Sequence, residues 1–181
     1  MATEASIRLD YEDYAAIPND GRRHEIIDGR HYVNPAPASY HQIVLMNLLI
    51  PLAEHVRTHR AGRVLPSPID VVLSAHDIVQ PDIVFVRAAN AKIIEPKNIK
   101  GAPDLVVEIL SDSNRRYDVR TKYELYERGG VSEYWIVDPD ELGVRVFRRD
   151  GEKFMLVEAA DPITTPLLPG FALPFADIFA M

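Results

Sequence analysis

The sequence predicts an α/β protein, because two strands of buried character lie along the chain between two helical segments. Residues 81–86 and 103–110 are short apolar runs, rich in β-branched side chains and bounded by turn formers, which is typical of buried strands. Residues 40–60 and 115–128 instead carry the start and stop signals of helices. At 181 residues the chain is long enough to bury a core, and we expect one domain over residues 1–181.

Local capping and turn signals define the first two elements. Residues 10–17 have the pattern of a short helix, with Asp10 as its cap. Residues 24–33 contain Asp28-Gly29, a strong tight-turn pair, between two stretches with apolar residues. We therefore expect an N-terminal hairpin.

The helix over residues 40–60 is unusually apolar. We expect Ser39 to cap it and Pro51, which lacks an N–H, to bend or divide it. Its small polar surface predicts cover on more than one side, by the sheet and by a second subunit of a homodimer. His41, in its first turn, is either a surface or capping residue or part of a site, and the sequence leaves both readings open.

The next segments border the first central strand. Residues 62–73 are expected to form one strand, which Pro66 and Pro68 restrict to an edge or an irregular approach. Residues 87–102 are polar and basic. They are either a solvated loop or a basic rim for phosphate contact, and both readings stay open.

The C-terminal third predicts more sheet. Residues 131–137 read as a strand, and residues 144–157 as a C-terminal hairpin that turns at Asp150-Gly151. Residues 175–179 should form a short packed turn of helix.

Composition narrows the class of protein. The chain has no cysteine, which excludes disulfides, thiolate metal sites and a cysteine nucleophile, and fits a reducing cytoplasm. A net charge of -7 counts against a dedicated nucleic-acid binder, although acidic metal ligands can lower the total while a basic rim faces phosphate. Residues 1–6 lack the features of a signal peptide, and the most apolar run, residues 43–52, is too short to cross a bilayer. We expect a soluble, cytoplasmic protein with no membrane partner.

Both central strands carry a carboxylate where apolar side chains are expected. An unpaired buried charge costs roughly several kcal/mol unless a metal or a cation compensates it. Alternation places Asp104 and Glu108 on one face of their strand. If the neighbouring strand pairs beside it, Asp82 and Glu108 stand about one strand spacing apart, ~4.8 Å. Two carboxylates so close repel each other unless positive charge lies between them.

Lys122 supplies that charge in the following helix. Its neighbours at helical spacing are Asp118, Val119, Leu125 and Tyr126. Lys122 should therefore face the sheet rather than solvent. It forms either a structural ion pair or part of a metal-dependent hydrolytic site, and the sequence leaves both open.

The order of these residues is similar to that of the PD-(D/E)xK nuclease superfamily: Asp82, then Glu108 with Ile109-Leu110, then a helical lysine. Longer phrases resemble the Uma-type, restriction-endonuclease-like family within it. They are His24-Glu25-Ile26-Ile27-Asp28-Gly29, Pro81-Asp82, residues 104–111, Asp118 with Lys122 and Tyr126, and residues 130–139. The resemblance covers nearly the whole chain from Glu25 onward, and the ordered set of phrases is specific where the short Asp/Glu pattern is weak.

The resemblance implies a central mixed β-sheet flanked by helices. It also implies Mg²⁺, with Mn²⁺ as a substitute, held by Asp82, Glu108 and the carbonyl of Ile109. In the superfamily pattern a lysine stands two residues after the glutamate. Here that place is Leu110, and Lys122 resembles a migrated replacement. By the same resemblance Glu25 is an accessory acidic residue.

The expected activity is a magnesium-dependent DNA endonuclease in which a metal-activated water hydrolyses the phosphodiester bond. Lys122 would position that water or stabilise the pentacovalent state. Two alternatives remain open. One is a non-catalytic binding module that keeps the fold, and the other is a metal phosphoesterase that acts on a substrate smaller than DNA.

Overall fold

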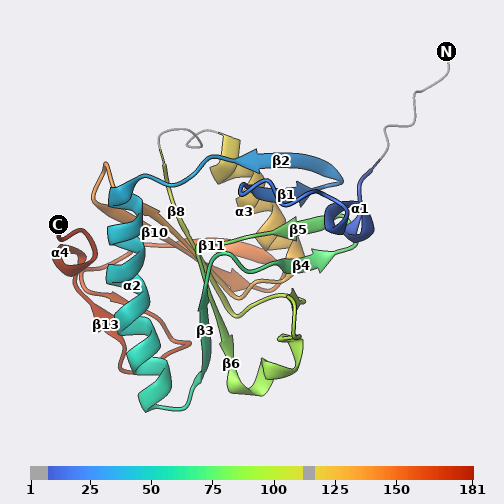
Figure 1. Ribbon diagram of the computed structural model, residues 1–181. Helices are drawn as coiled ribbons and strands as arrows, with labels where there is room; N and C mark the ends of the chain where they lie inside the picture. The colour runs from blue at the N-terminus through green and yellow to red at the C-terminus, as the bar shows by residue number, and fades with distance from the viewer. Residues whose placement is uncertain (1–7, 112–116) are drawn as a thin grey trace.

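The computed structural model describes residues 8–111 and 117–181, and its centre is a six-stranded sheet with the order β11-β10-β9-β8-β6-β3 (Figure 1). Its strands are β3 (Gly62–Pro66), β6 (Ile83–Arg87), β8 (Leu105–Ile109), β9 (Glu133–Asp138), β10 (Gly143–Asp150) and β11 (Lys153–Val157). β8 and β9 are parallel, and every other neighbouring pair in this sheet is antiparallel. The predicted mixed sheet is confirmed.

A second sheet, with the order β2-β1-β5-β4-β7, lies beside the first. Its strands are β1 (Arg23–Ile27), β2 (Arg30–Asn34), β4 (Val71–Ser74), β5 (Asp77–Val79) and β7 (Ile99–Lys100). The predicted N-terminal hairpin is confirmed as β1 and β2, with Asp28 and Gly29 both at positive φ, as a tight hairpin turn requires. This hairpin belongs to the second sheet, where β1 also pairs with β5.

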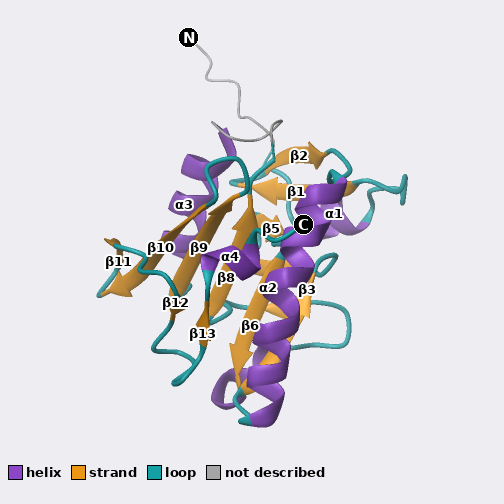
Figure 2. Ribbon diagram, turned by 90° about the vertical axis from the view of Figure 1, so that its left-hand side faces the viewer, coloured by secondary structure: helices purple, strands orange, loops and turns teal. Residues whose placement is uncertain are grey.

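Helices and the second sheet cover the two faces of the central sheet. α2 (Ser39–Thr58) packs Val44, Leu48 and Leu52 against one face, together with the C-terminal segment. α3 (Tyr117–Gly129) and the second sheet cover the other face through a separate apolar cluster that includes Tyr126. Figure 2 shows α2 and α3 on different sides of the central strands. The predicted flanking by helices is confirmed.

The remaining elements are short. They are α1 (Tyr11–Ala15), the 3-10 helix η1 (Ala88–Ile93), β12 (Ile163–Thr164), β13 (Ala172–Leu173) and α4 (Phe175–Ile178). Asp10 caps α1 as predicted, because its side chain accepts from the N–H groups of Glu12 and Asp13. The C-terminal hairpin and the helical turn at the end of the chain are also confirmed. Within residues 8–111 and 117–181, no helix is long and apolar enough to cross a membrane.

The prediction of one strand over residues 62–73 is wrong. β3 ends at Pro66 in the central sheet, and β4 begins at Val71 in the second sheet, so the chain changes sheets between them. A proline donates no ladder hydrogen bond, and Pro66 and Pro68 mark the place where the chain leaves the first sheet. The predicted edge position holds for β3, which ends the strand order of the central sheet.

The cap predicted for α2 is corrected, and of the two effects predicted for Pro51, a bend or a division, the division is wrong. Ala38 occupies the N-cap position, and Ser39 is the first helical residue and makes no side-chain cap. The helix continues through Pro51 without division. A proline inside a helix costs ~3 kcal/mol, because one hydrogen bond is lost and the ring crowds the preceding turn, but Leu48 and Leu52 on either side are fully buried and hold both halves against the sheet.

Residues 87–102 are more ordered than a solvated loop. They contain η1 and β7, and Asn98 and Ile99 are buried. The start of the helix predicted over residues 115–128 falls on residues 115 and 116, which lie outside the described residues. The helix exit is confirmed, because α3 ends at Gly129 and Gly130 follows at positive φ.

Candidate active site

The pairing of β6 with β8 brings two buried carboxylates opposite each other. The antiparallel register pairs Ile83 with Val107, so Asp82 and Glu108 occupy the next opposed positions. Opposed residues of an antiparallel pair have Cβ atoms about 5 Å apart. Both side chains are buried, as the sequence predicted for carboxylates within apolar strands.

Asp82 is held by donors from three elements. Its Oδ1 accepts from Arg23 Nη1 at 3.0 Å, while its Oδ2 accepts from His41 Nε2 at 3.2 Å and from the Ile109 N–H at 2.8 Å. Burial alone would raise the pKa of Asp82, but His41, Arg23 and the Ile109 N–H together hold that pKa below its usual value. Asp82 therefore stays an anion at neutral pH.

Lys122 reaches this cluster from α3. Its Nζ donates to Glu108 Oε1 at 2.9 Å and to Glu25 Oε1 at 3.1 Å, and only 1% of Lys122 is exposed. The lysine therefore faces the sheet, as its helical spacing predicted. Lys122 is thus in direct contact with the two buried carboxylates Glu25 and Glu108.

Glu25 enters the same network from β1. Its Oε1 also accepts from the Gln80 N–H at 2.8 Å, and its Oε2 accepts from Asn34 Nδ2 at 2.8 Å. Burial would raise the pKa of Glu25, but Lys122 and these two donors hold that pKa below its usual value. Glu25 is thus a permanent anion that shares the ammonium of Lys122 with Glu108.

Tyr126 closes the cluster on α3. Its hydroxyl donates to Glu108 Oε1 at 2.6 Å, one turn of helix after Lys122. Burial first, and then the charge of Glu108, raise the pKa of Tyr126 well above its usual value. The phenol therefore remains a neutral donor.

Some members of this cluster were missed by sequence reasoning. Arg23 shares a face of β1 with Glu25 by simple alternation, and that spacing could have revealed it. Asn34 and Gln80 carry no such signal, because their roles depend on how β2 and β5 pair with β1. His41, left open by the sequence, lies inside the cluster with 7% of its surface exposed.

One residue of the sequence motif, Asp104, does not join the described cluster. Asp104 lies at the start of β8, where it accepts from the N–H and Nε of Arg87 and from Asn90 Nδ2. The side chain of Asp118 lies outside the described residues. Ile109 contributes its N–H to Asp82, and this bond fixes the backbone beside the two carboxylates.

The chemistry of the donor set fits a hard divalent cation. Among the described side chains, three carboxylates, Glu25, Asp82 and Glu108, share the two permanent cations Arg23 and Lys122. No three acidic, histidine or cysteine side chains converge as a ligand set within the described part of the chain. Mg²⁺ is commonly bound by one or two carboxylates with waters and substrate phosphate completing its shell, which this arrangement allows.

Comparisons with known proteins agree with this fold. A solved structure, described as a putative nuclease belonging to DUF820 from Anabaena variabilis ATCC 29413, superposes with a TM-score of 0.79. The two sequences are 21% identical, and the match covers 94% of this chain and 97% of that chain. At this identity the likeness shows the fold. No curated protein matches the sequence.

The family comparison covers almost the entire sequence. The family model Uma2, described as "Putative restriction endonuclease", matches residues 11–176. The matched range contains β1, β8 and α3, which carry Glu25, Glu108 and Lys122, and also Asp82, the residue just before β6. The chain therefore belongs to the Uma2 family.

Proposed function

We propose that this protein is a magnesium-dependent DNA endonuclease that hydrolyses phosphodiester bonds. The observation that carries the proposal is the contact of Lys122 with Glu108 in a buried cluster, in which Glu108 lies opposite Asp82. The description of the Uma2 family and that of the similar Anabaena variabilis protein support the same reaction class. The Mn²⁺ ion would substitute for Mg²⁺, since both prefer oxygen ligands.

The metal would be held by the carboxylates of Asp82 and Glu108, with the Ile109 carbonyl as a further oxygen ligand. When bound, Mg²⁺ supplies Lewis-acid stabilisation of phosphate charge and lowers the pKa of a coordinated water. The remaining tasks fall to the side chains of this chain.

Lys122 is the residue placed to stabilise negative charge in the transition state. Its ammonium lies in a site with little solvent, where hydrogen bonds to developing charge are stronger than in water. Glu25 and Glu108 orient that ammonium, and the lowered pKa of Glu25 keeps the pair ionised. Arg23, the most exposed charged member of the cluster, lies where a phosphate could reach it from solvent.

A plasmid-cleavage assay tests the proposal. Wild-type protein with Mg²⁺ or Mn²⁺ should convert supercoiled plasmid to nicked or linear DNA, and EDTA should stop the reaction. Asp82→Asn and Glu108→Gln should each lower the rate at least ~100-fold, since they remove a proposed metal ligand. Glu124→Gln, an exposed carboxylate on α3, is the matched control and should cleave at the wild-type rate. Equal nicking by all four proteins would show a contaminating nuclease and reject the proposal.

The hydrogen bonds of the cluster also favour a second candidate, a non-catalytic module that keeps the fold. Both oxygens of Asp82 and of Glu25 already accept hydrogen bonds from the chain, as in a structural ion-pair network. Titration calorimetry with Mg²⁺ separates the two candidates. Heat of binding that disappears in Asp82→Asn supports the enzyme, whereas no binding by wild-type protein supports the module.

A further inference from the structure

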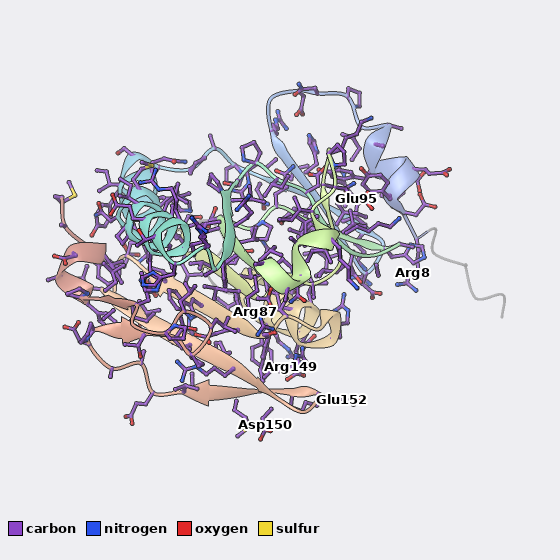
Figure 3. The ribbon with its side chains drawn as sticks, turned by 90° about the horizontal axis from the view of Figure 1, so that it is seen from below. Arg8, Arg87, Glu95, Arg149, Asp150 and Glu152 are labelled. Atoms are coloured by element: carbon purple, nitrogen blue, oxygen red, sulfur yellow. The ribbon has the colours of Figure 1, made fainter. Side chains whose placement is uncertain are left out.

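A groove of about 910 Å³ lies beside the edge strand β3, away from the carboxylate cluster. Its walls are the last turns of α2 and the helix η1, and its floor includes Val64 and Leu65 of β3. Figure 1 shows the lower end of α2 and η1 on either side of β3. Figure 3 looks toward this end of the molecule, where the labelled Arg87 pairs with Gly62 in the β3–β6 ladder.

The charge of this groove is entirely positive. Arg57, Arg60 and Arg63 line it, all three are exposed, and no carboxylate lines it. Within residues 8–111 and 117–181 none of the three makes an ion pair, and Arg63 donates only to the carbonyl of Gly62. Arg8, Arg87 and Arg148, in contrast, pair with carboxylates. Three neighbouring arginines without acidic partners are unexpected on a chain in which 27 acidic residues outnumber 20 basic ones.

Helix electrostatics accounts for only part of this arrangement. Arg57 lies in the last turn of α2, where a cation also complements the helix dipole. Arg63 lies on β3, outside the helix, and Arg60 follows the helix at positive φ. Their convergence on one groove indicates an anionic ligand, for which planar guanidinium groups are well suited.

The groove and the carboxylate cluster lie at opposite ends of the same strand pair. The ladder runs from Gly62 and Arg87 at the groove to Pro66 and Ile83 beside Asp82. The Ser67 N–H then donates to the Asp82 carbonyl, which ties the far end of β3 to the cluster. Four steps along a strand span about 13 Å, and a nucleic-acid strand rises about 3.4 Å per nucleotide.

We propose that Arg57, Arg60 and Arg63 bind the phosphate backbone of the DNA about four nucleotides from the bond that is cleaved. This inference rests on the proposed nuclease function and deepens it, because it requires a polynucleotide rather than a small phosphate ester. The arginines contact phosphates and therefore position the strand without reading its sequence. The apolar floor receives the stems of the arginines and the sugar edge of the strand.

The salt dependence of DNA binding tests this assignment. Fluorescence anisotropy with a 20-base-pair duplex in EDTA would compare wild-type protein with the variant R57Q/R60Q/R63Q. Loss of three phosphate contacts should reduce the slope of log affinity against log salt by roughly 2.7. Between 50 and 200 mM salt the wild-type affinity should then fall about 40-fold more than that of the variant.

Arg145→Gln is the matched control, because Arg145 is also an exposed strand arginine but lies on β10, outside the groove. Arg145→Gln should change the slope of log affinity against log salt by no more than about 1, because it removes one surface charge. Equal slopes for wild type and R57Q/R60Q/R63Q would overturn the inference. A variant that changes the sedimentation of the free protein but not its DNA affinity would also overturn it, and would assign the groove to a second copy of the chain.

Hydrolysis of bis(p-nitrophenyl) phosphate separates this inference from the proposed function. With Mg²⁺ or Mn²⁺, R57Q/R60Q/R63Q should hydrolyse this small ester at the wild-type rate while it cleaves DNA more slowly. If wild-type protein hydrolyses neither substrate, the proposed function fails. The anisotropy slopes still decide whether the groove binds DNA. Loss of small-ester hydrolysis in the variant alone would overturn the assignment of the arginines to the distant backbone.

Discussion

At the scale of single residues, Lys122 is the cation on which two buried carboxylates depend. Lys122→Met should lower the free energy of unfolding by about 3–5 kcal/mol, because Glu25 and Glu108 would lose their shared partner. Urea unfolding at pH 7 measures the effect. Lys97→Met removes an exposed lysine and should change the free energy by less than about 0.5 kcal/mol. Equal midpoints for the two variants would contradict the buried ion pair.

Acid should weaken the fold through Glu25 and Asp82. Both carboxyls have a pKa lowered by folding, so they contribute stability that is complete above the unfolded values, 4.5 for glutamate and 3.8 for aspartate. That contribution is lost as the pH falls below those values and through the lower folded pKa of each group. Thermal unfolding between pH 6 and pH 2 should show the loss. Glu25→Gln should be less stable at pH 6 but should lose less stability on acidification, and an identical pH profile would reject this role.

The sequence pointed to three residues that the structure brings into one buried cluster, but not to their full set of partners. Asp82 and Glu108 were recognisable because a carboxylate within an apolar strand requires compensation. Lys122 followed from helical spacing alone. Arg23 contacts Asp82, and Gln80 contacts Glu25, only because the second sheet brings β1 and β5 to the end of β6, a long-range pairing that no local pattern encodes. His41 stayed open because its contact with Asp82 depends on how α2 packs against the central sheet.

At the scale of elements, local chemistry predicted ends and turns better than strand partners. The cap of α1 and the Asp28-Gly29 turn depend on a few neighbouring residues and were predicted correctly. Residues 62–73 were assigned to one strand because their composition is continuous. The division arises since Leu65 pairs with Val84 in one sheet, whereas Val71 pairs with Val79 in the other. The continuity of α2 through Pro51 likewise depends on packing rather than on propensity.

The β3–β6 ladder makes a specific demand at Gly62. A Cβ at this residue would lie 2.0 Å from the carbonyl oxygen of Val86, and this backbone contact cannot relax through a rotamer change. Gly62→Ala should therefore lower the free energy of unfolding by more than about 2 kcal/mol. Gly151→Ala is the control, because Gly151 also has positive φ but has open space around it. Urea unfolding should show the larger loss at Gly62, and equal losses would mean that backbone conformation alone sets the cost.

At the scale of the whole molecule, the two sheets and their flanking helices leave part of α2 uncovered. Met46 and Ile50, one turn apart on the helix, are 45% and 48% exposed. The face that they begin continues through Ala53 and Arg57 and leads to Arg60 just beyond the helix, so this surface changes from apolar to basic along its length. The apolar half and the basic half of this face can therefore have different partners.

We also predict that residues 1–181 form one domain. A single cooperative unfolding transition would support this prediction.

We predict that the apolar half of this face joins two copies of the chain into a homodimer. Burial of Met46 and Ile50 against a partner would remove apolar surface from water, worth roughly 25 cal/mol per Å². Sedimentation equilibrium should give a dimer for wild-type protein and a monomer for M46S/I50S. Met155→Ser and Leu156→Ser, which alter exposed apolar residues on β11, should leave the dimer intact. Because the arginines remain in M46S/I50S, its DNA binding should keep the per-chain salt dependence of the wild type. A wild-type protein that sediments as a monomer even at concentrations about 100-fold above those of the binding assay would reject the dimer while leaving the groove assignment unchanged.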